Sequence, residues 1–403
     1  DSESRLYNGF NGLWIGNGAH HNRVGTDNSN DIFNAAERNV FSGTDGLAVI
    51  SGGNDNVIAG NYFGINSTAT KVFESNAGVV ITNGSKRNVL GTDGLGENND
   101  RERNVIGGSG FGRIIVSGAG TEDNVIAGNY VGVGPDGVTS LGYAPQGILV
   151  NGGAKRTRIG TDGNGVNDAA ERNVVTGNGL GIGISGVGTS GTVVAGNYIG
   201  TDATGSLRMQ NTYAMDITGG ASDTRIGTDG SNDAFNINER NIISGGGFGL
   251  RMISVTNVTI AGNYIGLNAA GTEGIRHYEY AIRAMNHISG LRIGTNGDGI
   301  ADAVEGNVIA GGNAVGVQMF NWISMGLETA DMFIAGTIPV TTATGSFAQA
   351  DLVDGTSVMA GDWGYNNSIP GRGGDYFAYR ATGSLSVNTA GNYTLAMRMD
   401  QGG

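Results

Sequence analysis

The chain has 403 residues, a formal net charge of −13, 76 glycines, only four prolines and no cysteine. The acidic charge argues against a nucleic-acid partner, which requires a basic face, and it is compatible with divalent cations. No apolar run approaches the roughly 18 residues that a spanning helix needs, so we expect no membrane insertion.

A block of about 67 residues repeats four to five times along the chain, and the last copy is degraded. Each copy contains a Gly-Thr-Asp or Gly-Thr-Asn phrase, followed by Glu-Arg-Asn or Glu-Gly-Asn. The glycines that open these phrases are Gly25, Gly91, Gly160, Gly227 and Gly294. Self-similarity at a fixed period indicates a solenoid, in which each unit buries its apolar face against its neighbours.

Each block divides into two halves of 32–35 residues, and each half offers three short strands. The first strand of each half is expected to open at one of ten places: Gly12-Leu13, Gly46-Leu47, Gly78-Val79, Gly112-Arg113, Gly147-Ile148, Gly181-Ile182, Ala214-Met215, Gly249-Leu250, Ala281-Ile282 and Ala314-Val315. Three strands per turn, stacked on the next turn, predict an all-β, right-handed parallel β-helix of about ten coils over residues 1–335. We expect the chain to begin within this array of repeats.

One bend of every turn carries an asparagine: Asn39, Asn61, Asn104, Asn129, Asn173, Asn197, Asn241, Asn263 and Asn307. An amide both donates and accepts hydrogen bonds, so stacked asparagines can bond each other and the neighbouring backbone. The tyrosines that follow in alternate turns (Tyr62, Tyr130, Tyr198 and Tyr264) are interpreted as packing residues rather than a ligand platform.

The long loop after each Gly-Thr-Asp phrase is the strongest candidate for a metal site. Oxygen ligands at alternate positions, closed by a later carboxylate, suit a hard cation such as calcium. The predicted ligands are Asp27, Ser29, Asp31 and Glu37; Asp162, Asn164, Asp168 and Glu171; Asp229, Ser231, Asp233 and Glu239; and Asn296, Asp298, Asp302 and Glu305. The second copy has a different spacing (Asp93, Glu97, Asp100, Glu102) and is a weaker candidate.

The same residues also have a purely structural interpretation. Asp and Asn can form turns through their side chains, and each glutamate can pair with the arginine that follows it: Arg38, Arg103, Arg172 or Arg240.

Catalytic residues are harder to find, because the chain has only four histidines. Residues 274–280 depart most from their sibling loops, and His277 lies among them. We take Arg251, His277 and Arg283 as the catalytic candidates, and we expect Arg251 and Arg283 to point outward from stacked strands near Asp216. The alternative is that these charges belong to an ordinary solvated strand face.

The periodicity ends near residue 335, and residues 336–403 are predicted to form a small C-terminal β segment. Its Ala390-Gly391-Asn392-Tyr393 run resembles the opening strands of a PA14-type β-sandwich. The alternative is that this segment covers the open strand edges of the last coil.

The phrases Val-Ile-Ala-Gly-Asn-Tyr-Val-Gly at residues 125–132 and Gly-Thr-Asp-Gly at residues 160–163 resemble the β-helix repeats of secreted bacterial surface proteins. The asparagine column is similar to that of the pectate-lyase-like superfamily. The resemblance covers residues 12–335 and implies a fold that serves lyases, hydrolases, adhesins and inert stalks alike.

We therefore expect a non-enzymatic structural or adhesive solenoid, extracellular or at the cell surface, that is part of a larger protein and stabilised by calcium. The alternative is a polysaccharide-active lyase or glycoside hydrolase. The expected partners are polysaccharides or other cell-surface components, and a second copy of the chain, end to end or side by side.

Overall fold

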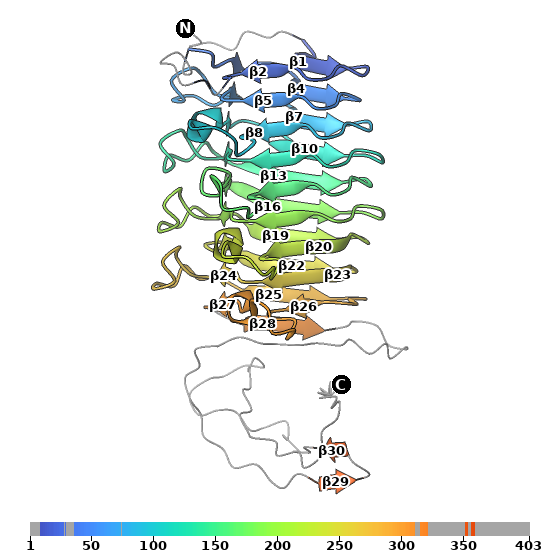
Figure 1. Ribbon diagram of the computed structural model, residues 1–403. Helices are drawn as coiled ribbons and strands as arrows, with labels where there is room; N and C mark the ends of the chain where they lie inside the picture. Colours follow the sequence, from blue (N-terminus) through green and yellow to red (C-terminus); the bar gives the residue numbers. More distant parts are fainter. Residues whose placement is uncertain are drawn as a thin grey trace. The chain divides into compact units, whose positions relative to one another are not determined.

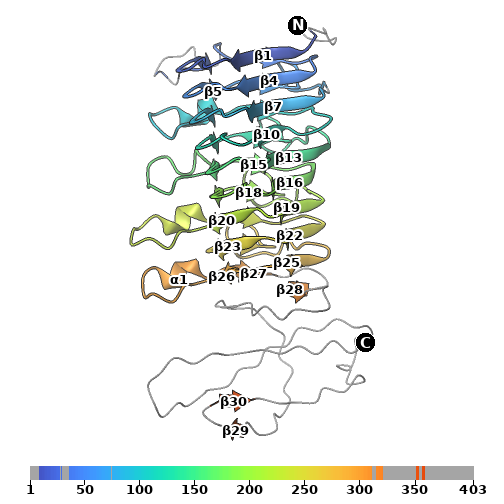
Figure 2. The same cartoon turned by 90° about the vertical axis from the view of Figure 1, so that its right-hand side faces the viewer.

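The computed structural model describes residues 9–27, 29, 36–73, 75–310 and 315–320, and the backbone of residues 351–353 and 356–358. The chain divides into two compact units, residues 1–339 and residues 340–403. In the first unit every turn of the chain supplies one strand to each of three parallel sheets, which Figures 1 and 2 show stacked along one axis.

Sheet A holds the first strand of each turn. Its ten strands are, in order, β1 (Asn11–Gly16), β4 (Gly46–Ser51), β7 (Ala77–Thr82), β10 (Ile114–Ser117), β13 (Ala144–Asn151), β16 (Asn178–Ser185), β19 (Tyr213–Thr218), β22 (Phe248–Ile253), β25 (Tyr280–Met285) and β28 (Val315–Phe320).

Sheets B and C hold the second and third strands, nine in each. Sheet B contains β2 (Arg23–Gly25), β5 (Val57–Ala59), β8 (Val89–Gly91), β11 (Val125–Ala127), β14 (Arg158–Gly160), β17 (Val193–Ala195), β20 (Ser222–Gly227), β23 (Thr256–Ala261) and β26 (Arg292–Ile293). Sheet C contains β3 (Val40–Phe41), β6 (Tyr62–Phe63), β9 (Val105–Ile106), β12 (Tyr130–Val131), β15 (Val174–Val175), β18 (Tyr198–Ile199), β21 (Ile242–Ile243), β24 (Tyr264–Ile265) and β27 (Val308–Ile309).

The predicted all-β parallel β-helix is thus confirmed, with nine turns that contribute to all three sheets and a tenth strand in sheet A. The core consists of aliphatic columns, because identical positions of successive turns lie directly above one another. In sheet A one buried column runs through Ile15, Ile50, Ile81, Val116, Val150, Ile184, Ile217, Met252 and Ala284. Each turn therefore removes the apolar face of the next from water.

The asparagine column forms a ladder at the bend between sheets B and C. Each side-chain amide from Asn39 to Asn263 donates to the amide oxygen of the asparagine one turn later, over 2.9–3.4 Å. Most of these amides also donate to a backbone carbonyl, as Asn173 does to Ile126. The predicted structural role of the column is confirmed, since it satisfies polar backbone groups that the bend would otherwise bury unpaired.

A second, shorter ladder lies at the bend between sheets A and B. There Asn22, Asn56, Asn88 and Asn124 bond each other at 2.8–3.0 Å. Threonines take over this position in later turns, at Thr157, Thr192 and Thr224.

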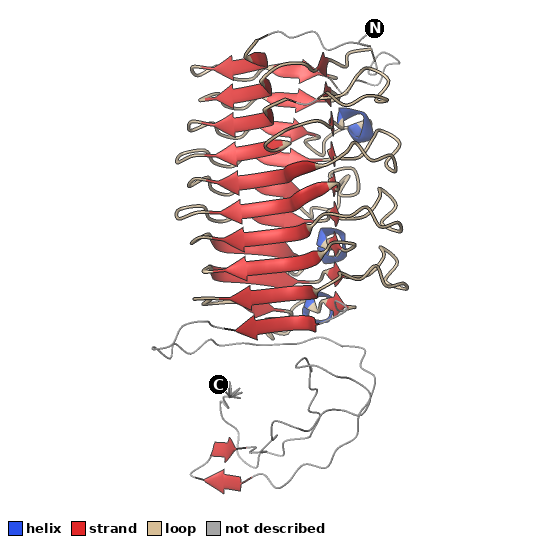
Figure 3. Cartoon of the chain, turned by 180° about the vertical axis from the view of Figure 1, so that it is seen from behind, coloured by secondary structure: helices blue, strands red, loops and turns tan. Residues whose placement is uncertain are grey.

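Two rows of long loops leave the helix on either side of sheet C. The B–C loops follow the glycines of the Gly-Thr-Asp and Gly-Thr-Asn phrases, and their described residues are 26–27, 29, 36–39, 92–104, 161–173, 228–241 and 295–307. They carry three short helices: η1 (Asn99–Glu102), η2 (Asn236–Glu239) and α1 (Asp302–Glu305). The C–A loops are residues 64–76, 132–143, 200–212 and 266–279. The B–C loops project to the left in Figure 2 and the C–A loops to the left in Figure 1; in Figure 3 the blue helices mark the B–C row.

In the second unit the structure describes two short antiparallel strands, β29 (Asp351–Val353) and β30 (Thr356–Val358). The predicted boundary at residue 335 and the PA14-like run at residues 390–393 lie outside the described residues. Within the described part of the chain no helix is long and apolar enough to cross a membrane.

Candidate functional site

The B–C loop of the third copy gathers three of the predicted metal ligands. Ligand oxygens of Asp162, Asp168 and Glu171 all lie within 4.8 Å of one another. Asp168 and Glu171 are buried, whereas Asp162 is exposed. Asn164 lies beside them, and its side-chain amide donates to Asp162 Oδ2 over 3.1 Å. The predicted ligand types therefore meet in this copy.

All six carboxylate oxygens of this triad already accept hydrogen bonds from the protein. Glu171 accepts from Arg158 Nη1 at 2.8 Å and from the backbone amide of Asp162 at 3.0 Å. Asp168 accepts from the Thr161 hydroxyl at 2.7 Å, and from the Gly165 amide and Asn238 at 3.0 and 2.6 Å. Asp162 accepts from the amide and the side chain of Asn164. With one oxygen from each carboxylate, the triad offers a cation three ligand atoms, about half of the six to eight oxygens that calcium takes.

The glutamate at the end of each loop is held by the same contacts in other copies. Glu239 pairs with Arg225 at 2.6 Å, and Glu305 pairs with Arg292 at 3.0 Å. Each also accepts a backbone amide hydrogen bond, from Asp229 and Asn296 respectively. Burial raises the pKa of the Glu171 and Glu239 carboxyls, although the paired arginines oppose the shift.

The prediction that each glutamate pairs with the arginine next to it in sequence is wrong. The partner is instead the arginine two residues before the glycine of the Gly-Thr-Asp or Gly-Thr-Asn phrase, as Arg158 is before Gly160. The second copy has Val89 at that position, and Arg23 from the first copy reaches Glu102 at 3.0 Å instead. Arginine recurs two residues before the glycine of the phrase, at Arg23, Arg158, Arg225 and Arg292. This recurrence could have identified the partner of the glutamate from the sequence.

The remaining predicted ligands form turns within their own loops. Asp27 Oδ1 accepts from the Ser29 amide and Glu37 from the Asp27 amide; Asp233 accepts from the Ser231 hydroxyl and the Phe235 amide. Asp298 and Asp302 bond the amides of Ile300 and Gly299. In the fourth copy Asn236, rather than an acid, occupies the position of Asp168. Asp31 lies outside the described residues.

The arginines that follow the glutamates stack on the tyrosines of sheet C. The guanidinium carbons of Arg38, Arg103, Arg172 and Arg240 lie 4.1–4.2 Å from the ring centroids of Tyr62, Tyr130, Tyr198 and Tyr264, in that order. The C–A loops cover other parts of these rings. For example, a Cβ added at Gly271 would lie 2.7 Å from the Tyr264 ring. The tyrosines are packing residues in this arrangement.

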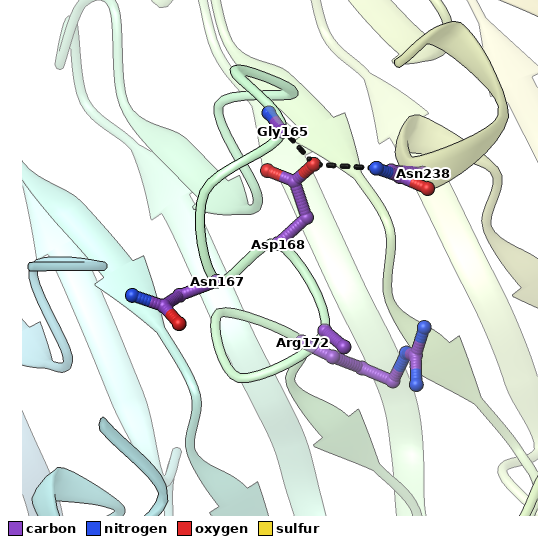
Figure 4. A pocket seen from close by; sticks show the side chains of 6 residues that line it. Gly165, Asn167, Asp168, Arg172 and Asn238 are labelled. Atoms are coloured by element: carbon purple, nitrogen blue, oxygen red, sulfur yellow. Dashed lines mark hydrogen bonds between the residues drawn. The ribbon is translucent and has the colours of Figure 1, made fainter. Parts of the chain in front are cut away.

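Two depressions open beside these arginines. One, of about 260 Å³, is lined by Arg172, Asp168, Asn167 and Asn238, among others. Figure 4 shows its Arg172 side chain extending away from the Asp168 carboxylate, which faces Asn238. The other, of about 320 Å³, is lined by Arg38, Arg103, Tyr62 and Pro135, together with Asp100 and Arg101.

Two of the three catalytic candidates lie on the outer face of sheet A. Arg251 and Arg283 are register neighbours on β22 and β25, and Asp216 precedes them on β19. Asp216 binds Arg251 through two hydrogen bonds of 2.7 and 2.9 Å, which raise the pKa of Arg251. Beside them Tyr213 and Phe248 stack with ring centroids 4.5 Å apart, and the Tyr280 ring lies tilted to Phe248 with centroids 5.4 Å apart.

The third candidate, His277, is completely buried. Its Nε2 lies 3.1 Å from the Ile243 carbonyl oxygen. Burial lowers the pKa of His277 to about 4, so the ring is neutral at pH 7. The structure thus brings Arg251 and Arg283 together, but encloses His277 in the interior.

One buried charge is absent from the sequence-based expectations. Arg113 is fully buried just before β10, and burial lowers its pKa to about 10. Its guanidinium bonds the Gly107 and Gly142 carbonyls at 2.6 and 2.9 Å, and the side chain of Asn178. The sequence does indicate this residue, because Arg113 occupies a position where most other sheet A strands open with an aliphatic residue.

Comparisons with known proteins give no family assignment. No family model and no curated protein matches the chain. Among solved structures, a PL6 alginate lyase in complex with a trisaccharide has 12% identity over 88% of this chain and 86% of that one, with a TM-score of 0.22. A hyper-glycosylated TibA fragment has 13% identity over 78% and 97%, with a TM-score of 0.13. Because both TM-scores are low, the fold description rests on the strands themselves.

Proposed function

We propose that this chain is a non-enzymatic structural or adhesive solenoid, an extracellular or cell-surface segment of a larger protein. The observation that carries the proposal is that the repeated polar residues bond within the solenoid. The asparagines bond each other, and the loop glutamates bond arginines and backbone amides. These contacts recur copy after copy, as expected of residues that stabilise a scaffold.

The proposed absence of catalysis is tested by incubating the full chain with uronate polymers and with neutral polysaccharides. Lyase activity produces unsaturated products that absorb in the ultraviolet, and hydrolysis releases reducing ends. We expect neither signal. Product formation that increases with protein concentration would refute the proposal.

Stabilisation by calcium is a separate part of the proposal, and the Asp162, Asp168 and Glu171 triad is its best location. These residues would supply carboxylate oxygens to a cation that favours them. The test compares melting temperatures in excess calcium and in chelator, for the natural chain and for Asp162→Asn. We expect calcium to raise the melting temperature of the natural chain more than that of the variant. An identical melting temperature in calcium and in chelator would refute stabilisation by calcium and would leave the proposed scaffold role unaffected.

The alternative function, a polysaccharide-active enzyme, is favoured by the outer face of sheet A. Three adjacent aromatic rings offer apolar contacts to a sugar chain, and Arg251 and Arg283 beside them offer charged ones. If this face is catalytic, Arg251→Gln abolishes product formation while Arg87→Gln, at the bend between sheets A and B, leaves it unchanged.

Self-association of the chain is a further part of the proposal, which light scattering at two concentrations tests.

A further inference from the structure

Within the part of the chain that the structure describes, the arginines stacked on the sheet C tyrosines have no carboxylate partner, unlike seven other arginines of the solenoid. Arg23, Arg87, Arg156, Arg158, Arg225, Arg251 and Arg292 each form a salt bridge. Among the described residues, no salt bridge involves Arg38, Arg103, Arg172 or Arg240. In a chain of net charge −13, four cations in one row without acidic partners are unexpected.

These four side chains are held in place before any ligand arrives. Each guanidinium lies over a tyrosine ring. The Nε atoms of Arg38, Arg172 and Arg240 also donate to the carbonyls of Gly60, Gly196 and Gly262, at 3.3, 3.0 and 2.9 Å. These contacts use one face of each group and, in Arg38, Arg172 and Arg240, Nε as well. No hydrogen bond within the described residues uses the terminal nitrogens of the four arginines. Because the side chains are already ordered, a ligand would lose little entropy in binding them.

The four arginines recur at a regular spacing. Each stacks on a tyrosine of every second sheet C strand, in the order β6, β12, β18 and β24. Neighbouring strands lie about 4.8 Å apart, so successive arginines are separated by roughly 10 Å and the row spans roughly 30 Å. Both depressions beside sheet C are lined by members of this row. A ligand that engages all four must be a linear polymer with regularly spaced anions.

We propose that the row of Arg38, Arg103, Arg172 and Arg240 binds an extended sulfated polysaccharide along the axis of the solenoid. An arginine fork matches an oxyanion with several terminal oxygens. The four arginine residues are half-buried, and the two rows of loops lie on either side of sheet C. A sulfate ester projects from its sugar ring through a bridging oxygen, so it reaches such a recess better than a carboxylate attached directly to the ring. An extended polysaccharide advances by roughly one coil height per sugar, so sulfate on alternate sugars follows the arginine spacing.

This inference deepens the proposed adhesive role and rests on it. Asp168 does not block the row, because the Thr161 hydroxyl, the Gly165 amide and Asn238 already engage its carboxylate. Asp100 lines the other depression together with three arginines, so positive charge predominates there.

The test measures binding of the full chain to dextran sulfate, uncharged dextran and polygalacturonate by calorimetry at low salt. We expect the sulfated polymer to bind best, and its binding to weaken as salt is added. Affinity should also rise with oligosaccharide length until the ligand spans the row. Equal or tighter binding of polygalacturonate, or no binding of dextran sulfate, would overturn the sulfate assignment.

The decisive variant is Arg103→Gln with Arg172→Gln, and its matched control is Arg87→Gln with Arg156→Gln, which removes the same net charge at the bend between sheets A and B. Loss of two charge-assisted contacts should weaken binding by roughly tenfold or more, and the control should bind nearly as well as the natural chain. Equal loss in both would show that net charge alone governs binding.

If the glutamine variant does not fold, Arg103→Lys with Arg172→Lys replaces it, since lysine keeps the charge and removes the fork. Weakened binding supports the proposal, and unchanged binding overturns it. Dextran sulfate that binds without product release supports both proposals. Binding of dextran sulfate together with product release supports polysaccharide binding by the arginine row but refutes the non-enzymatic scaffold role. The absence of both binding and product release refutes only the binding by the arginine row.

Discussion

Two rows of arginines lie on either side of the B–C bend and have opposite environments. Arg158, Arg225 and Arg292, in or directly beside sheet B, pair with buried glutamates. Arg103, Arg172 and Arg240, at the entrance to sheet C, stack on tyrosines and have no acidic partner among the described residues. The first row anchors the loops, and the second leaves positive charge at the surface of an acidic protein.

The difference arises from backbone geometry. Arg103 and Arg240 follow their short helices in extended conformation, with φ of −59° and −58° and ψ of 121°. The chain therefore leaves the helical turn at the arginine, and the glutamate of that turn and the arginine after it contact different partners, as Glu239 and Arg240 do. Sequence adjacency is therefore a poor guide to pairing at such a bend, whereas adjacency between stacked turns is a good one.

The largest effect is expected from breaking the first row with Arg158→Gln. Glu171 is 0% exposed and Arg158 only 20%, so the substitution leaves a buried carboxylate without its cation. Removing one partner of such a pair should lower the free energy of unfolding by about 2–3 kcal/mol, allowing for the partial exposure of Arg158. Urea denaturation followed by circular dichroism measures the loss.

The control for that variant is the double substitution Arg158→Gln with Glu171→Gln. Removing the charge as well as its partner should recover part of the lost stability, because no ion is then left buried. If the single and double variants were equally unstable, the pair would contribute through packing alone.

A second effect is expected within the asparagine ladder. Asn173→Ala removes hydrogen bonds to Asn197 and to the Ile126 carbonyl, and leaves the Asn129 amide groups without their acceptor. We expect a loss of about 2 kcal/mol, since the stranded groups are buried. Asn39→Ala, at the exposed first rung, should cost much less. Equal losses at both positions would contradict a role for burial in the ladder.

A third and smaller effect is a dependence of stability on pH. The pKa values of Glu102, Glu171 and Glu239 are raised above their unfolded value of 4.5, chiefly by burial. The folded state therefore binds protons more tightly, and this contribution is complete below pH 4.5 and lost as pH rises through the folded pKa values.

The exposed pairs act in the opposite direction. Arginine hydrogen bonds lower the pKa values of Asp55 and Asp123, so their contribution is present above the unfolded value of 3.8 and lost as pH falls through the folded pKa values. Solvent screens these pairs, and we expect the buried glutamates to dominate between pH 4.5 and 7. Melting temperatures at pH 5 and 7.5 measure the balance; Glu171→Gln should reduce the difference, and a higher melting temperature at pH 7.5 would contradict the assignment.

The repeat period and the asparagine column were sufficient to predict the three sheets and the ladder. Both depend on residues that recur at the same position of every turn, and stacking converts that recurrence directly into contact. The register of Gly46–Ser51 was not predictable in the same way, because Leu47, Ala48 and Ile50 are all buried and strict alternation fails there.

The candidate sites were less predictable, because they depend on contacts between loops. The meeting of Asp162, Asp168 and Glu171 follows from alternating acids in one loop, and spacing alone suggested it. The hydrogen bonds to Arg158 and Asn238, and the burial of His277, depend on how neighbouring strands and loops pack. His277 was a catalytic candidate because of its residue type, but the fold buries its ring completely.

The smallest effect is expected from the second row, with Arg172→Gln. This side chain is half-buried, stacks on Tyr198 and donates one hydrogen bond to Gly196, but it neutralises no buried acid. We expect a loss of about 0.5–1 kcal/mol, close to that of a partly exposed cation–π pair. The substitution is chemically identical to Arg158→Gln and lies only 14 residues away, so the two denaturation curves compare the two rows directly. If Arg172→Gln were as destabilising as Arg158→Gln, the second row would be structural in the same sense as the first, and its open charge would need no ligand to explain it.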